Sequence, residues 1–332
     1  MLIGVVGAGS WGTTVANLLV QNGHQVKIWA REVEVVESIN ADHVNGVFLA
    51  NCELDHRLVA VGEIGQAVKG VDLIVSAAPS HATRKVFELV QAEVGDERPV
   101  IVSISKGLEP ETHYTMTHVI SEMIPGAPVV ALSGPSFAKE VFEQRPTAIV
   151  AASDDQNASG LVQQACSNGY FRVYTSSDPL GVQLGGALKN VVAIAAGILD
   201  GLDLGTNPRA ALLTRGLAET TRLGEVLGAD PHTFAGLAGM GDMLLTATGP
   251  LSRNRTLGIE LAQGKTLDQI MNERRTVAEG VNTAKVANDL AIETGVELPI
   301  ANEVEKILFE NKSPKQAIRD LMERELKAER WW

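Results

Sequence analysis

The stretch Leu2-Ile3-Gly4-Val5-Val6-Gly7-Ala8-Gly9-Ser10-Trp11-Gly12 decides the fold. Its apolar run predicts a β-strand, and the apolar residues beyond Gly12 predict a helix. The pattern Gly7-x-Gly9-x-x-Gly12 between a strand and a helix is the dinucleotide-binding fingerprint. Gly7 permits the tight turn, Gly9 lets a pyrophosphate approach the backbone, and Gly12 lets the helix pack close to the strand. A glycine turn without a ligand is the alternative, but this strand-helix context favours a cofactor site.

Strands and helices alternate through the first half of the chain, which predicts a doubly wound α/β sheet of Rossmann type with right-handed crossovers. Several predicted strands are continuous Val, Ile and Leu runs, as expected for strands covered by helices on both faces. The predicted strands are Leu2–Val6, Gln25–Trp29, Leu58–Val61, Leu73–Ala77, Val100–Ser105, Val129–Ser133, Ala148–Ala152 and Phe171–Tyr174. The predicted helices between them are Trp11–Asn22, Glu32–Asn40, His81–Ala92, Glu111–Met123 and Asp154–Asn168.

The pattern changes near Ser177-Asp178-Pro179. Beyond this point no strand is predicted, and Pro and Gly separate successive helical patterns. We therefore expect a dinucleotide-binding domain over residues 1–178 and an all-helical substrate-binding and catalytic domain over residues 179–332. The predicted helices are Leu180–Asp200, Pro208–Leu227, Thr256–Gln263, Thr266–Met271, Val281–Glu293, Pro299–Phe309 and Pro314–Lys327.

The charge and cysteine content exclude several classes of function. A formal net charge of −12 opposes binding to nucleic acid, which needs a basic surface. An anionic substrate would need a local cluster of cations, because the global field repels it. The two cysteines, Cys52 and Cys166, lie far apart and outside any CxxC pair, so we expect neither a disulfide framework nor a zinc site. The seven histidines show no metal-binding spacing, so no other metal site is expected.

Targeting and membrane segments are not expected either. The first apolar run is interrupted by Gly4 and lacks a basic flank, so it predicts a strand and not a signal peptide. Later apolar stretches such as Val191–Leu199 are too short to span a bilayer. Together with the cysteine usage, this predicts a cytoplasmic protein.

The residues after the second predicted strand bear on the choice of cofactor. That strand, Gln25–Trp29, should end near the adenine ribose, where NAD-specific sites usually place an acidic residue. This chain has Ala30-Arg31, and arginine can pair with the 2′-phosphate of NADP. NADP is therefore favoured, although Glu32 just beyond keeps NAD possible. A solvated Arg31 at a helix start is the other interpretation.

Three predicted strands end in loops with small polar residues. These loops are Pro79-Ser80-His81, Ser105-Lys106-Gly107 and Ser133-Gly134-Pro135-Ser136. In an open parallel sheet, loops at the carboxyl ends of strands line the ligand crevice. We therefore expect the three loops to share one pocket, although Pro and Gly are also ordinary turn residues.

Lys189 is the most unusual residue of the helical half. It lies in a predicted helix that is apolar or small almost all round, and such a helix is buried. Lysine is almost never buried without a partner. A snorkelling or ion-paired lysine is one interpretation. The other is a general acid/base whose pKa is lowered by burial and nearby cations, because ketone reduction needs a proton at the oxygen.

Two further groups of residues complete the candidate chemistry. Asp242, among small and apolar residues, could orient Lys189, bind a substrate hydroxyl, or simply cap a helix. Ser252-Arg253-Asn254-Arg255 places phosphate-binding donors at a predicted helix start, and a capped, solvated turn is the alternative.

Taken together, the blocks in this chain resemble the bacterial-type NAD(P)-dependent glycerol-3-phosphate dehydrogenases. They follow the family order across nearly the whole chain, and their combination is specific although each one is weak. The blocks are Gly7-Ala8-Gly9-Ser10-Trp11-Gly12-Thr13, Ser105-Lys106-Gly107-Leu108-Glu109, Ser133-Gly134-Pro135-Ser136-Phe137-Ala138-Lys139-Glu140, Leu188-Lys189-Asn190-Val191, Gly239-Met240-Gly241-Asp242-Met243, Ser252-Arg253-Asn254-Arg255 and Glu279-Gly280.

The resemblance implies a role for individual residues. Lys189 is implied as the proton acceptor in the oxidation direction. The implied substrate residues are Lys106, Gly134, Ser136, Lys189, Asp242, Ser252, Arg253 and Asn254. The implied cofactor contacts, beside Gly7, Gly9 and Gly12, are Ser10, Trp11, Arg31, Phe48, Lys106, Ala138, Arg253, Val277 and Glu279. Family members often carry His or Arg at the position of Arg31, so this residue leaves both NAD and NADP open.

The implied reaction is reversible hydride transfer between NAD(P)H and dihydroxyacetone phosphate, giving sn-glycerol 3-phosphate for phospholipid synthesis. Two alternatives stay open: a non-catalytic NAD(P)-binding sensor, and another two-domain reductase of the 2-hydroxyacid or ketopantoate type. A sensor would not need Lys189, Asp242 and Arg253 together, and the other reductases would not need the phosphate donors. Apolar helical faces in the second half favour a homodimer, and the Trp331-Trp332 tail could pack on the body or lie free.

Overall fold

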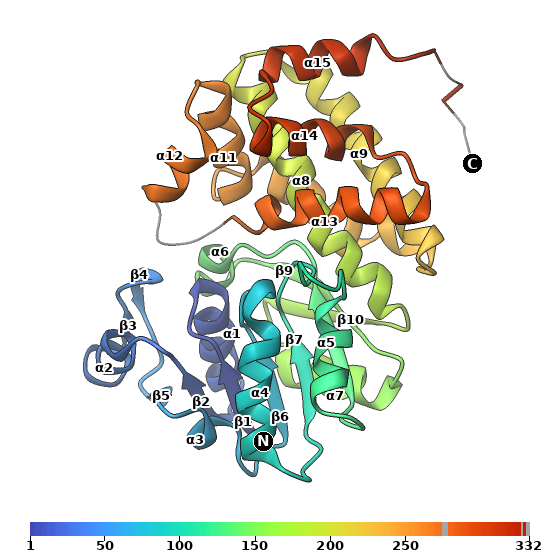
Figure 1. Ribbon diagram of the computed structural model, residues 1–332. Helices are drawn as coiled ribbons and strands as arrows, with labels where there is room; N and C mark the ends of the chain where they lie inside the picture. Colours follow the sequence, from blue (N-terminus) through green and yellow to red (C-terminus); the bar gives the residue numbers. More distant parts are fainter. Residues whose placement is uncertain (274–277, 327, 330–332) are drawn as a thin grey trace.

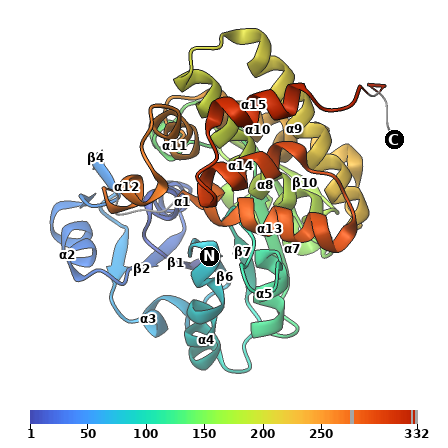
Figure 2. The same ribbon diagram turned by 45° about the horizontal axis from the view of Figure 1, so that its top comes forward.

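The computed structural model, which describes residues 1–273, 278–326 and 328–329, has two lobes. An α/β lobe built from the first half of the chain lies below a helical lobe built from the second half in Figure 1. A view turned by 45° shows the same arrangement from above, with α13 (Glu279–Thr294) running close to the boundary (Figure 2).

The α/β lobe contains an eight-stranded sheet in the order β10-β9-β8-β7-β6-β1-β2-β5. All neighbouring strands are parallel except β8 and β9, which pair antiparallel. The doubly wound sheet is therefore confirmed, but the antiparallel pair was not predicted. The strands are β1 (Leu2–Val6), β2 (Gln25–Trp29), β5 (Val59–Val61), β6 (Leu73–Ser76), β7 (Val100–Ser103), β8 (Val129–Ser133), β9 (Thr147–Ala152) and β10 (Phe171–Ser176).

Helices cover both faces of this sheet, which explains the continuous apolar strands. Ile3 and Val5 of β1 pack in one core with α1 (Ser10–Gln21) and α7 (Gln156–Cys166). Val6 packs in a second core with α3 (Ile64–Val68), α4 (Thr83–Val94) and α5 (Met116–Met123). Since successive strand residues point to opposite faces, each face buries its own apolar set.

Some local predictions for this lobe were incomplete or wrong. The helix predicted over Glu111–Met123 begins only at Met116, because residues 109–115 form a loop closed by a Leu108–Thr115 bridge. Elements too short for a clear period were missed: α3, α6 (Ala138–Phe142), and the antiparallel pair β3 (Val44–Asn45) and β4 (Leu49–Glu53). The remaining predicted helix is α2 (Val33–Asp42), and a 3₁₀ turn, η1 (Ser80–Ala82), precedes α4.

The helical lobe is assembled around α8 (Pro179–Gly201), whose residues are almost all buried, as the sequence predicted. By length and mean hydropathy, α8 is the one helix among the described residues that could cross a membrane. However, 94% of its 18-residue apolar stretch is buried inside the protein, as in a core helix. Around it lie α9 (Thr206–Val226), α10 (Asp242–Thr248), α11 (Arg253–Ala262), α12 (Leu267–Asn272), α13, α14 (Pro299–Phe309) and α15 (Pro314–Met322). The short turns η2 (Pro231–Ala235) and η3 (Leu237–Gly241) and helix α10 were missed.

Candidate functional site

The glycine loop joins β1 to α1 at the point where the strand order reverses, between β1 and β6. Gly7 has φ +113°, a conformation that favours glycine. A Cβ on Gly12 would lie 2.1 Å from the carbonyl oxygen of Gly7, so only glycine lets α1 pack this close. A Cβ on Gly9 would meet nothing within 4 Å, and Gly9 caps α1 without a side-chain hydrogen bond. The loop therefore offers free space and the positive end of a helix to an anion.

Three predicted cofactor residues lie around this loop. Ser10 donates a hydrogen bond to the carbonyl oxygen of Phe48, and the Phe48 amide donates to the Asn45 side chain at 3.0 Å. Thr14 of α1 donates to the carbonyl oxygen of Ala138 at 3.3 Å. The structure thus brings Ser10, Phe48 and Ala138 to one end of α1, although they come from three separate segments.

Trp11 and Arg31 were also predicted to contact the cofactor. Trp11 follows Ser10 in the first turn of α1, and its buried indole N–H has no acceptor among the described residues. Arg31 follows β2, is largely exposed, and pairs with Glu32 at 2.8 Å. Its position beyond the end of β2 is where a dinucleotide ribose would lie.

A buried charge cluster lies where the two lobes meet. Asp242, which is 1% exposed, accepts a hydrogen bond from Lys189 on one carboxylate oxygen at 2.5 Å and from Lys106 on the other at 2.7 Å. Lys106 also donates to the Gly134 carbonyl at 2.8 Å and lies 3.5 Å from the Ser136 hydroxyl. Five predicted substrate residues are thus brought together in one place.

The elements that hold these side chains follow from local sequence. Lys106 lies in the loop that follows β7. This loop lies beside the loop after β8, which contains Gly134. Lys189 projects from the middle of α8, and Asp242 is the first residue of α10 after the wide π-helical turn η3. Asp242 is therefore inside the helix, so the interpretation of it as an N-cap is wrong.

The protonation of Lys189 is shifted by its surroundings. Burial lowers its pKa to about 7, although the nearby Asp242 carboxylate raises it, and the Lys106 ammonium lowers it further. The lysine is ion-paired with Asp242, as one interpretation of the sequence predicted. The ion-paired interpretation is confirmed, and the general acid/base role stays a prediction.

A line of buried amides joins this cluster to the remaining predicted residues. The Asn190 side chain donates to the Lys106 carbonyl at 3.3 Å and accepts from Asn254 at 2.9 Å. Asn254 in turn accepts from the Gly280 amide at 3.1 Å. Its neighbour Glu279 accepts from the Ser80 hydroxyl at 2.6 Å. The line connects the strand-end loops of the α/β lobe with α8, α11 and α13.

The Ser252-Arg253-Asn254-Arg255 segment forms the first turn of α11. Ser252 is buried and caps the helix by accepting from the Arg255 amide at 3.2 Å. Arg253 is exposed, and its guanidinium has no hydrogen-bond or ion-pair partner among the residues that the structure describes. Among the described residues it is therefore an unpaired cation beside the N-terminus of α11. Arg255, by contrast, is already paired with Asp200.

Sequence reasoning missed two residues of the cluster and named one that cannot be placed. Thr246 accepts a hydrogen bond from Lys189 at 2.7 Å, and its spacing of four from Asp242 on α10 could have indicated it. Asn190 received no role, although it follows Lys189 directly. Val277 lies outside the described residues, as does the Trp331-Trp332 tail.

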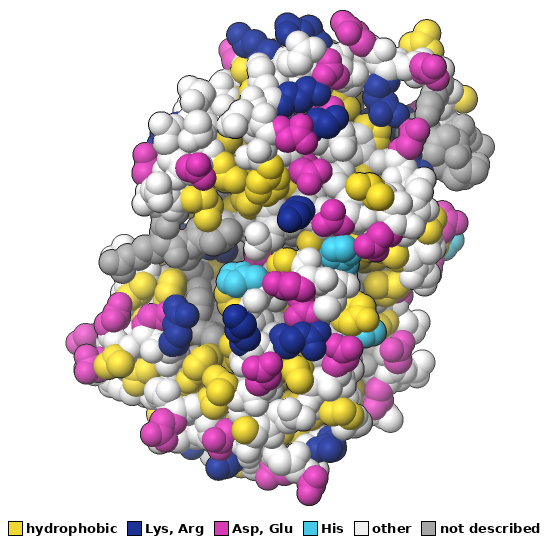
Figure 3. Space-filling view, viewed as in Figure 1, with side chains coloured by type: hydrophobic (Ala, Val, Ile, Leu, Met, Phe, Trp, Pro, Cys, Tyr) yellow, Lys and Arg dark blue, Asp and Glu magenta, His cyan; other side chains and the backbone are white. Residues whose placement is uncertain are grey.

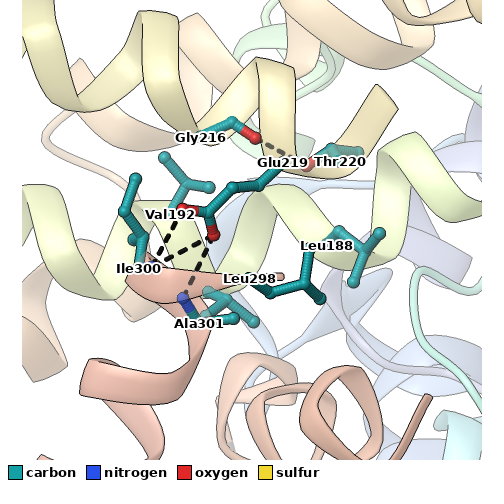
Figure 4. Close-up of a pocket in the computed structure, with 9 residues that line it drawn as sticks. Leu188, Val192, Gly216, Glu219, Thr220, Leu298, Ile300 and Ala301 are labelled. Atoms are coloured by element: carbon teal, nitrogen blue, oxygen red, sulfur yellow. Dashed lines mark hydrogen bonds between the residues drawn. The ribbon is translucent and has the colours of Figure 1, made fainter. Parts of the chain in front are cut away.

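A small cavity lies elsewhere, between α8, α9 and the start of α14 (Figure 4). It has a volume of about 20 Å³ and surrounds the buried carboxylate of Glu219, which accepts from the amides of Ile300, at 2.9 Å, and Ala301. This cavity has room for about one water molecule and contains none of the predicted site residues. On the face seen in Figure 3, acidic and basic side chains are interspersed over both lobes.

Comparisons with known proteins agree over the whole chain. Residues 2–159 match the family of the NAD-dependent glycerol-3-phosphate dehydrogenase N-terminus, and residues 178–319 match its C-terminus. The chain is 52% identical to a glycerol-3-phosphate dehydrogenase (NAD(P)+) of Geobacter sulfurreducens, over 99% of both chains. It is similar to the crystal structure of a glycerol-3-phosphate dehydrogenase from Coxiella burnetii, with a TM-score of 0.93 and 36% identity, over 97% of this chain and 98% of that one.

Proposed function

This chain belongs to the NAD-dependent glycerol-3-phosphate dehydrogenase family, and from that premise we propose how its residues carry out the reaction. The protein is an oxidoreductase that uses NAD or NADP to interconvert dihydroxyacetone phosphate and glycerol 3-phosphate. The observation that carries the mechanism is the buried carboxylate of Asp242 held between Lys106 and Lys189.

The cofactor half of the site is the loop between β1 and α1. The open space at Gly9 and the absence of a side-chain cap on α1 fit a pyrophosphate, whose oxygens would accept from the first backbone amides of the helix. Ser10, Trp11, Phe48, Ala138 and Glu279 are proposed to surround the rest of the dinucleotide. When bound, the nicotinamide supplies the hydride for the carbonyl carbon.

The substrate half is the lysine cluster together with the first turn of α11. Arg253 and the capped helix start, with Ser252 and Asn254, would hold the phosphate. Lys106, Gly134, Ser136 and Asp242 would hold the glycerol portion. Phosphate binding then fixes the ketone next to Lys189, so binding energy from a remote group serves orientation.

Lys189 is proposed as the general acid and base. In its ammonium form it stabilises the negative charge that develops on the C2 oxygen and donates a proton to it. In the reverse direction the neutral amine accepts that proton from the C2 hydroxyl. Asp242 and Thr246 hold the Lys189 amine in one orientation, since both accept hydrogen bonds from it.

Replacing Lys189 tests this assignment. We expect Lys189→Ala to lower kcat by about 10²- to 10⁴-fold, because one proton transfer loses its catalyst. The dissociation constant for NADPH, measured by fluorescence titration, should change little. The exposed lysine variant Lys285→Ala serves as the control and should keep wild-type turnover. Wild-type turnover in Lys189→Ala would exclude the proposed role.

The preference between the two cofactors is proposed to depend on Arg31. Its exposed guanidinium lies beyond β2 and can turn from Glu32 to a 2′-phosphate, so we favour NADP. Steady-state comparison of NADH and NADPH after Arg31→Asp should show a much larger loss of kcat/KM with NADPH. Equal losses with both cofactors would reject this role.

Four further expectations stay predictions. The domain boundary at residues 178 and 179 is supported by the end of β10 at Ser176 and the start of α8 at Pro179. The homodimer, the cytoplasmic location and the supply of glycerol 3-phosphate to phospholipid synthesis are consistent with the family. Membership of the family also disfavours the two alternative functions, a non-catalytic NAD(P)-binding sensor and another two-domain ketoacid reductase.

A further inference from the structure

We propose that Asp200, near the end of α8, is a positioning residue for phosphate recognition and acts through Arg255 on Arg253. The proposal rests on the proposed function of Arg253 in holding the substrate phosphate. Asp200 lies near the end of α8, the helix that also carries Lys189, and it takes no part in the charge cluster of Lys106, Lys189 and Asp242.

Asp200 is the centre of a second ion-pair group. Its carboxylate side chain is 8% exposed and accepts from Arg255 at 2.6 Å on one oxygen. Arg209 of α9 pairs with the other oxygen. Because a buried carboxylate is stable only when it is paired, the Arg255 side chain is strongly held in this one direction.

The backbone of α11 is held just as closely against α8. A Cβ on Gly197 would lie 2.0 Å from the Arg255 carbonyl oxygen, and a Cβ on Gly258 would lie 2.0 Å from the Ile194 carbonyl oxygen. Two glycines therefore allow direct backbone contact between the helices. This contact leaves little freedom for sliding, and the Asp200–Arg255 pair resists rotation of the first turn.

The fixed position of Arg255 determines the orientation of Arg253, two residues before it. Its guanidinium has no partner of its own in the described part of the chain, so its direction depends on the turn that carries it. Arg255 holds that turn by two contacts. Its backbone amide donates to the Ser252 side chain, and its guanidinium donates to Asp200. Asp200 thus orients the phosphate-binding turn from the same helix that carries Lys189.

The test compares two substrates, dihydroxyacetone phosphate and the phosphate-free ketone dihydroxyacetone. In Asp200→Asn, kcat/KM for dihydroxyacetone phosphate should fall about tenfold or more, because small misplacements of a binding group are costly. The value for dihydroxyacetone should stay near wild type. Arg255→Met should reproduce this selective loss and replaces Asp200→Asn if that variant does not fold. Arg209→Gln, which keeps the Arg255 pair, is the matched control and should change neither value.

A double-mutant cycle with Arg253→Ala completes the test. Since Asp200 acts through Arg253, the double variant Asp200→Asn/Arg253→Ala should lose no more than Arg253→Ala alone. Additive losses, or an equal loss with both substrates, would overturn the role of Asp200. If Arg253→Ala itself shows no selective loss with the phosphorylated substrate, the phosphate assignment of the proposed function fails, independently of Asp200.

Discussion

Lys106 and Lys189 share the carboxylate of Asp242, which gives this acidic protein the local group of cations that an anionic substrate would need. With both lysines protonated the cluster carries one net positive charge in a buried place, where electrostatic interactions are stronger than in water. The overall charge of −12 is spread over the surface and is screened there. At the proposed substrate site, we therefore expect the local cations to outweigh the overall negative charge.

The shifted pKa of Lys189 predicts the pH dependence at this scale. In the proposed mechanism, reduction needs the ammonium form of Lys189, which predominates below its pKa of about 7 and is lost above it. We therefore expect kcat/KM for ketone reduction to fall as pH rises through about 7, and that for glycerol 3-phosphate oxidation to rise over the same range. Steady-state rates measured from pH 5.5 to 9 in both directions would check this.

A matched variant identifies the group that titrates. Glu219 also has a pKa raised to about 7, but it lies behind α8 and outside the lysine cluster. Glu219→Gln should therefore keep the inflection near pH 7. If the inflection disappears in Glu219→Gln, the pH profile reports the titration of Glu219 and not that of Lys189.

At the scale of single elements, the glycine loop shows that the three fingerprint glycines are needed for different reasons. Gly12 is required by the fold, because its neighbour is a backbone carbonyl. Gly9 faces open space and has φ −66°, a conformation that alanine adopts freely. A glycine is needed at position 9 only if a ligand such as the pyrophosphate approaches the backbone there.

This difference gives a paired prediction. Gly12→Ala should lower the free energy of unfolding by about 1–3 kcal/mol, because the added methyl group has no space. Gly9→Ala should unfold like the wild type in urea but bind NADPH on the order of tenfold more weakly. Urea unfolding and fluorescence titration would separate the two effects. Undiminished NADPH binding in Gly9→Ala would place the pyrophosphate elsewhere.

The contact between α9 and the start of α14 is held by Glu219 (Figure 4). Burial raises the pKa of this carboxyl to about 7, although hydrogen bonds from the Ile300 and Ala301 amides lower it. The native state therefore binds a proton more tightly than the unfolded chain. Its contribution to stability is complete at low pH and is lost as pH rises from about 4.5 to about 7.

Glu219→Gln should remove this dependence. The wild type should lose up to about 3 kcal/mol of unfolding free energy between pH 4.5 and pH 8 through this group, and the variant should lose correspondingly less. Urea unfolding of both proteins at pH 5 and pH 8 measures the difference. The same pH dependence in both proteins would show that Glu219 is ionised throughout the range.

At the scale of the whole molecule, the site exists only because the two lobes meet. Lys106 and Gly134 come from strand-end loops of the sheet, whereas Lys189 and Asp242 come from the helical lobe. Val182 of α8 and Ala238 of η3 pack against Ala131 and Ala152 of the sheet, so the lobes share a small apolar core. This shared core fixes the position of the lysines relative to one another.

The sequence by itself determined the doubly wound sheet apart from its one antiparallel pair, the glycine loop and the apolar helix around Lys189, because each depends on residues close together in the chain. Apolar periodicity and glycine spacing are local, so they can be recognised without coordinates. The short elements α3 and α6 and the late start of α5 could not be recognised, since tertiary contacts stabilise them.

Only the tertiary structure decided which charged residues become partners. The chain brings Lys106 to Asp242 across 136 residues, and no periodic pattern encodes a contact of that length. It also separates two neighbouring arginines, leaving Arg253 exposed while Arg255 pairs with Asp200. Such choices depend on burial and distance in the folded state, because a buried charge must find a partner there and an exposed one need not.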